Sequence, residues 1–130
     1  MRNIVLGLLL AVAAGLLPVF AAHAPVDVGA YNSVISVKED DTAIIAEVKV
    51  QNREGNPYNI KKYSIDRGQE TITLLENRLY NEAGVLKATD KKRMKWTYSQ
   101  NQISAQALHD SIYEAVIKWA DEEKKDKKKK

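Results

Sequence analysis

The last third of the chain carries one apolar stripe at helical spacing, and this feature most limits the folds open to the sequence. Charged residues hold the opposite face of the predicted helix, while the stripe consists of Leu108, Ile112, Ala115, Val116 and Trp119. Ser104 is a suitable N-cap, and Ile103 before it can staple onto Leu108. About sixteen helical residues span ~24 Å, enough to cover one face of a sheet of four or five strands.

The sequence before this helix is typical of short β-strands. We predict five of them, at Tyr31–Val37, Thr42–Gln51, Tyr58–Asp66, Glu70–Tyr80 and Val85–Thr89. Pro25–Ala30 is a lead-in, and Asp90–Asn101 is irregular. The fourth strand is apolar on both faces near its middle, which predicts a central strand covered on both sides. The loops are too short for parallel crossovers. The expected fold class is therefore α+β, an antiparallel meander of about five strands packed against one C-terminal helix.

The N-terminus has the layout of a secretory signal peptide. Arg2 precedes an apolar run from Ile4 to Leu17, and small residues follow. The run is short for a membrane anchor, which needs about 20 apolar residues. Cleavage after Ala22-His23-Ala24 would leave Pro25 beside the cut, where proline hinders a peptidase, so cleavage after Val19-Phe20-Ala21 stays open. We expect residues 1–24 to be a signal peptide and the protein to be secreted or periplasmic.

Charge and length define the rest of the organisation. Residues 25–120 hold 13 Lys and Arg against 13 Asp and Glu, which makes a neutral single domain. A basic body of the kind that binds nucleic acid is absent from this sequence. Residues 121–130 hold six Lys against four acids and no apolar residue, so we expect a charged tail that is disordered or a frayed helix.

The sequence contains no recognisable catalytic set. It has no cysteine, which excludes thiol catalysis and thiolate metal sites, and its two histidines are His23 and His109. No G-x-S-x-G motif accompanies His109, and no glycine-rich phosphate loop occurs. The acidic run Glu39-Asp40-Asp41 lacks the spacing of an EF-hand and is most simply a turn. We predict neither an enzyme nor a cofactor or metal site.

Two basic segments are candidate partner-binding sites. In the irregular segment, lysines and arginine precede aromatic residues, and the candidates are Lys92, Arg93, Lys95 and Trp96. This cluster either docks an acidic or sugar-bearing partner or is a charged loop whose Trp96 lies under the helix. The tail lysines Lys127, Lys128, Lys129 and Lys130 either attract anionic lipids and phosphate-bearing polymers, or only keep the chain soluble.

The order of several short motifs resembles the bacterial surface-adhesin protein E-like family. The matching stretches are Tyr63-Ser64-Ile65-Asp66, Leu79 to Val85, Trp96, and Ser104 leading into Ile112-Tyr113-Glu114-Ala115-Val116. The resemblance implies an exported protein with an antiparallel sheet packed on a C-terminal helix, and some members are adhesins that bind host proteins. The family pattern places cysteines where Arg67 and Ile117 stand here, so these two residues should lie near disulfide reach, with Cα atoms within ~7 Å or a little more.

Export, a neutral body and this resemblance together predict a non-catalytic binding module with an unidentified protein or envelope partner. An open sheet edge would also allow a homodimer. The alternative is a structural envelope protein held to anionic surfaces by the segment Lys124–Lys130.

Overall fold

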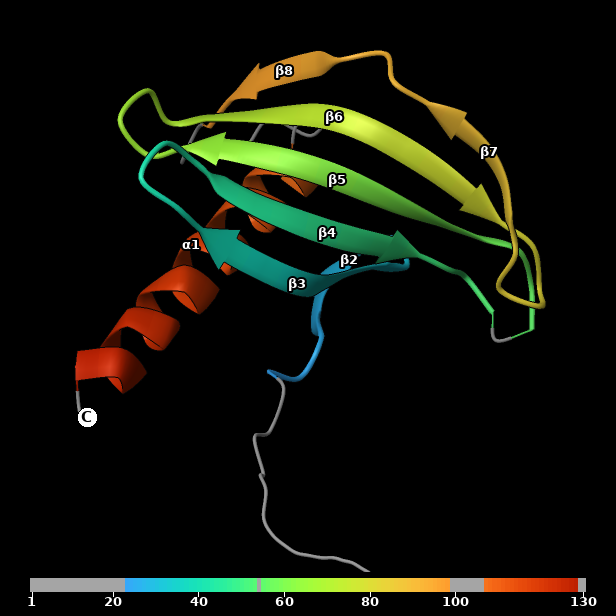
Figure 1. The fold of residues 1–130 in the computed structure, drawn as a ribbon, viewed down its shortest axis with the longest axis horizontal. Helices are drawn as coiled ribbons and strands as arrows, with labels where there is room; N and C mark the ends of the chain where they lie inside the picture. The colour runs from blue at the N-terminus through green and yellow to red at the C-terminus, as the bar shows by residue number, and fades with distance from the viewer. Residues whose placement is uncertain (1–22, 54, 99–106, 129–130) are drawn as a thin grey trace, which may run out of the picture.

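A single antiparallel sheet and one helix make up the fold (Figure 1). The computed structural model describes residues 23–53, 55–98 and 107–128. The elements in chain order are β2 (Val26–Gly29), β3 (Asn32–Glu39), β4 (Ile44–Val50), β5 (Tyr58–Asp66), β6 (Thr71–Tyr80), β7 (Leu86–Asp90), β8 (Met94–Thr97) and α1 (Ala107–Lys128). The predicted α+β class is confirmed. The predicted number of strands is wrong, because the described part of the chain forms seven.

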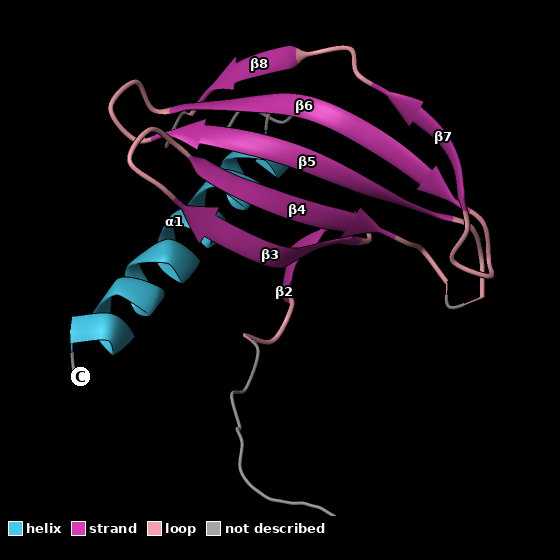
Figure 2. Cartoon of the chain, viewed as in Figure 1, coloured by secondary structure: helices cyan, strands magenta, loops and turns pink. Residues whose placement is uncertain are grey.

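The sheet is a meander up to β6 and then divides. Strands β2 to β6 pair in chain order, each antiparallel to the next. Both remaining strands pair with the outer edge of β6: β7 with Asn77–Tyr80 and β8 with Thr71–Leu74 (Figure 2). The chain therefore passes along the edge of β6 in two steps, and β8 ends beside the turn between β5 and β6.

Two strands were missed by the sequence analysis, and both lie at the margins of the sheet. Residues 26–29, expected to be a lead-in, form β2, and residues 94–97, expected to be irregular, form β8. Each has only four residues, and β8 contains Lys95 within a charged run. Marginal strands are short and need no continuous apolar face, so alternation of hydrophobic residues does not reveal them.

The helix covers one face of the sheet, as the apolar stripe predicts. It packs over β2 and β3 and reaches β4. Ile112 and Val116 are fully buried, Trp119 is 4% exposed, and Leu108 packs at the margin of the same core. The sheet contributes the inward side chains Val34, Val37, Ile44, Ala46, Val48, Tyr63, Ile65 and Ile72. The predicted cap at Ser104 and staple at Ile103 lie outside the described residues.

Strand β6 is central but is not covered on both faces. It pairs with β5 on one edge and with β7 and β8 on the other. Ile72 is buried in the core, whereas Leu75 is only half-buried. Among the described residues, no element packs on the face of the sheet opposite α1. The expectation of two-sided burial is therefore wrong. In the apolar middle of β6, a bulge opposite Lys62 and Tyr63 shifts the register between β5 and β6.

The described helix does not have the length and apolarity that a membrane span requires.

Candidate functional site: a groove beside the helix

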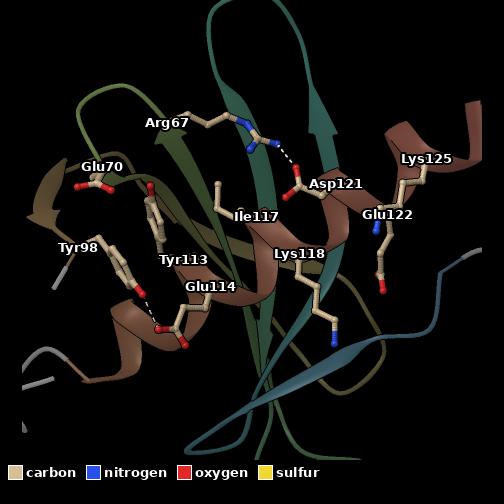
Figure 3. A pocket seen from close by; sticks show the side chains of 10 residues that line it. All are labelled: Arg67, Glu70, Tyr98, Tyr113, Glu114, Ile117, Lys118, Asp121, Glu122 and Lys125. Carbon is tan, nitrogen blue, oxygen red and sulfur yellow. Dashed lines mark hydrogen bonds and ion pairs between the residues drawn. The ribbon is translucent and has the colours of Figure 1, made fainter. Parts of the chain in front are cut away.

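A groove of about 610 Å³ runs beside α1 (Figure 3). Its walls come from three parts of the chain that are far apart in sequence. The turn between β5 and β6 contributes Arg67 and Glu70, the residue after β8 contributes Tyr98, and successive turns of α1 supply the rest, from Tyr113 to Lys125. The volume falls within the range of small-molecule and cofactor sites, which is about 300–1,000 Å³.

A stacked pair of tyrosines forms one end of the groove. The rings of Tyr98 and Tyr113 lie 4.3 Å apart between centroids, with their planes 11° apart. The backbone N–H of Tyr98 donates to the carbonyl of Glu70 at 2.8 Å, and its hydroxyl donates to Glu114 Oε2 at 2.6 Å. This second hydrogen bond is the main reason why the pKa of Tyr98 rises to about 12. Tyr98 is thus fixed through both its backbone and its side chain.

The pKa of the buried neighbour Tyr113 is affected by burial and by the charged groups at this end of the groove. Only 7% of Tyr113 is exposed, and burial is the main cause that raises the pKa of its hydroxyl. The carboxylates of Glu70 and Asp66 raise this pKa further, and Arg67 opposes them. The hydroxyl of Tyr113 therefore lies where the turn between β5 and β6 brings charged groups onto the helix.

Arg67 links three elements at the rim of the groove. Its guanidinium donates to both carboxylate oxygens of Glu39, at 2.6 and 3.0 Å, and to Asp121 Oδ1 at 2.9 Å. The bidentate contact holds the pKa of Glu39 below its usual range, with a smaller contribution from Lys124 at 3.1 Å. Since its Nε and one terminal nitrogen bond to two carboxylates of the protein, the charge of Arg67 is paired internally, and Arg67 positions the rim.

The remaining charges of the groove are separated along α1. Glu114 lies beside Tyr98, with the tyrosine rings between it and Glu70, and Lys118, Glu122 and Lys125 lie toward the other end (Figure 3). Ile117 lies between these ends and packs against the margin of the core. Glu122 accepts a hydrogen bond from His23 Nε2 at 3.0 Å, and the pKa of His23 is raised mainly by this contact.

The candidate residues of the basic and aromatic cluster differ in exposure. Lys92 and Arg93 are exposed in the link between β7 and β8, and Lys95 is exposed on β8. Trp96 instead stacks on His109 of α1, with ring centroids 3.6 Å apart. Because one face of its indole is covered by the helix, Trp96 is placed as in the alternative in which it lies under α1.

The tail candidates fall partly within the helix. α1 continues to Lys128, so Lys127 and Lys128 belong to its last turn, while Lys129 and Lys130 lie outside the described residues. Lys124 Nζ lies 3.1 Å from Glu39 Oε1 and ties this part of the helix to the end of β3.

His109 is half-buried between Trp96 and the edge of the Tyr63 ring. Burial is the main cause that lowers its pKa, and the charge of Lys61 lowers it further. Within the described part of the chain, no group of three or more His, Cys, Asp or Glu side chains is arranged to hold a metal ion.

Sequence reasoning missed the groove, although one signal for it exists. Trp96 and Tyr98 are two residues apart, and His109 and Tyr113 are four apart. Side chains share a face at a spacing of two in extended chain and of four in a helix. Matching these spacings would have predicted two stacked pairs between the segment after β7 and the helix.

Fold and groove together define an α+β protein with a ligand-sized groove between its helix and one margin of its sheet. Comparison of the chain with protein-family models, with curated proteins and with solved structures found no match.

Proposed function

We propose that this chain is an exported, non-catalytic binding module, similar to surface-adhesin protein E-like domains, that holds its ligand in the groove beside α1. The observation that carries the proposal is the fixed tyrosine pair. Tyr98 is held by two hydrogen bonds and stacked on buried Tyr113, so the aromatic surface is in place before a ligand arrives. Tyrosine supplies contact area at low entropic cost, and preorganisation strengthens binding.

The resemblance gives this proposal independent support. Arg67 and Ile117 stand where the family pattern places cysteines, and both line the groove. Arg67 also bonds to Asp121, one turn beyond Ile117 on α1. The turn between β5 and β6 is thus tied to the helix by an ion pair in the region where a disulfide would tie it.

The test compares two double variants that change the net charge by the same amount. Lys118→Glu/Lys125→Glu alters the groove, and Lys38→Glu/Lys87→Glu alters exposed lysines that lie outside both the groove and the basic and aromatic cluster. Purified chains, checked for folding by circular dichroism, are immobilised and exposed to fractionated envelope extract and host matrix proteins. We expect the groove variant to lose a component that the wild type and the control retain. Equal capture by all three chains, or no capture by any, would contradict the proposal.

A second candidate function follows from the continuation of α1 to Lys128. Four lysines, Lys124, Lys125, Lys127 and Lys128, fall within the last five residues of this helix, and each basic residue near an anionic membrane surface contributes about 1 kcal/mol. The protein would then be a structural envelope component held to anionic surfaces. A chain ending at Lys125 retains the contact between Lys124 and Glu39. If this function is correct, the shortened chain should no longer sediment with vesicles that contain anionic lipid. Unchanged sedimentation would contradict this function.

A further inference from the structure

The charges of the groove are opposite at its two ends once internal pairs are taken into account. At the tyrosine end, Glu70 and Glu114 are both carboxylates, and Glu114 has only a neutral donor, the Tyr98 hydroxyl, in the described structure. At the other end, Asp121 is paired with Arg67, and Glu122 is bonded to His23 in a chain that keeps this residue, as after cleavage at Ala21. Lys118 and Lys125 have no ion-pair partner among the described residues.

The floor between these ends suits an extended chain with an apolar side chain. Ile117 lies between the tyrosine pair and the two lysines (Figure 3). Along the helix axis, Glu114 is about 6 Å from Lys118 and about 16 Å from Lys125 at 1.5 Å rise per residue. A peptide of three or four extended residues spans about 10–13 Å, which lies between these two separations.

Building on the proposed function, we infer that the groove binds a short peptide with both ends free. Its terminal ammonium lies at the tyrosine pair, which Glu70 and Glu114 flank on its two sides (Figure 3), so that carboxylates and aromatic rings both attract a cation. Its terminal carboxylate lies between Lys118 and Lys125. An apolar side chain in the middle of the peptide packs on Ile117. The proposal therefore specifies both the class of ligand and its direction along α1.

The test uses the tetrapeptide Ala-Leu-Leu-Ala in four forms: free, N-acetylated, C-amidated and blocked at both ends. Affinity is measured by titration of the amide NMR spectrum of the whole folded domain. We expect the free peptide to shift groove resonances and each block to weaken binding about two- to fivefold, the range for one partly exposed charge contact. A doubly blocked peptide that binds as tightly as the free one would overturn the inference.

Variants test the direction of the peptide. Glu70→Gln should weaken binding of the free peptide and reduce its advantage over the N-acetylated form. Lys118→Gln/Lys125→Gln should likewise remove the effect of C-amidation, while the exposed control Lys38→Gln/Lys87→Gln should leave all four affinities unchanged. If Glu70→Gln instead removes the effect of C-amidation, the stated direction is wrong.

The outcome separates this inference from the proposed function. Suppose that no form of the peptide binds, yet an envelope component or a sugar oligomer shifts the same groove resonances. The peptide inference then fails and the binding module stands. If the groove variant also captures every partner as the wild type does, the proposed function fails with it.

Discussion

The indole of Trp96 stacks on the imidazole of His109, with ring centroids 3.6 Å apart and planes 14° apart. One turn further along α1, Tyr113 stacks on Tyr98, which lies two residues after Trp96. The period of two in the extended chain and the recurrence near four in the helix bring both pairs into register. The short strand β8 is therefore held against the helix by two ring contacts, and the second of them forms part of the groove.

Trp96→Ala should destabilise the protein and loosen the groove. A buried tryptophan typically contributes 3–5 kcal/mol, and because Trp96 is only half-buried, we expect the free energy of unfolding to fall by about 2–3 kcal/mol. Urea denaturation measures this change. Lys95→Ala, on the same strand but exposed, should stay within about 0.5 kcal/mol of the wild type. Equal losses in the two variants would show that the stack adds no stability.

His109 should make stability fall as the solution becomes mildly acidic. Burial lowers its pKa in the folded protein, so the unfolded chain takes up a proton first. The favourable contribution is complete above the ordinary histidine pKa of about 6.5 and is lost as pH falls through the lower folded value. His109→Phe keeps a ring on Trp96 but cannot titrate. Its unfolding free energy should therefore decline less than that of the wild type between about pH 7 and pH 5.

In a chain that keeps His23, as after cleavage at Ala21, this residue provides a control of opposite sign for the measurement. Glu122 raises the pKa of His23, so its contribution is complete below the ordinary value and is lost as pH rises through the folded value. His23→Ala should thus steepen the decline toward acid that His109→Phe reduces. Parallel pH profiles for the wild type and His109→Phe would contradict the assignment to His109.

The contact between Arg67 and Glu39 should appear as a second loss of stability at lower pH. The pKa of Glu39 is held down mainly by Arg67, so the pair stabilises the fold above the ordinary glutamate pKa of about 4.3. This contribution is lost as pH falls through the lower folded value. Arg67→Met should cost only about 0.5–1 kcal/mol at pH 7, because the Arg67 side chain is 35% exposed.

The dependence of stability on pH between about pH 5 and pH 3 tests the contribution of the contact between Arg67 and Glu39, because the ordinary carboxylate pKa values lie in this range. The stability of Arg67→Met should depend less on pH in this range than that of the wild type. Arg67→Lys keeps the charge but loses the fork-shaped contact, so it should fall between the two. An unchanged acid slope in Arg67→Met would show that other carboxylates dominate this range.

The parts of the fold that periodic burial determines could be predicted from the sequence. Ile112, Val116 and Trp119 were expected to cover the sheet and are buried against it. β5 has the predicted bounds, Tyr58–Asp66, because it lies inside the sheet between two turns. Burial on one face repeats at the spacing of the element, and that spacing is visible in a single sequence.

The margins and the groove could not be predicted in the same way. Strands β2 and β8 form because they pair with β3 and β6, respectively. Such pairing is a tertiary contact and is not visible in the local sequence. The groove depends on Arg67, Tyr98 and Ile117, which are distant in sequence and form no motif together. The edge strands also carry irregularities, next to Val28 in β2 and Lys87 in β7, and such bulges oppose pairing with another chain. Homodimerisation through an edge stays a prediction.

The turn between β2 and β3 offers a stabilising substitution. Ala30 and Tyr31 occupy its two central positions with φ of 51° and 62°. Positive φ at both positions is the pattern of a type I′ turn, for which Asn-Gly is preferred. A residue with a Cβ atom is strained in this region by about 1–2 kcal/mol. Tyr31 is 65% exposed, and it bonds to Gln51 only through its backbone carbonyl, so replacing its side chain removes little packing.

Ala30→Asn/Tyr31→Gly should therefore raise the free energy of unfolding by about 1 kcal/mol, because relief of strain outweighs the added freedom of glycine in the unfolded chain. Thermal and urea denaturation of the double variant measure the gain. Ala88→Gly in β7, where φ is not positive, is the matched control and should destabilise by about 0.5–1 kcal/mol. A double variant no more stable than the wild type would show that the hairpin tolerates these conformations without cost, and the strain argument would then fail for this turn.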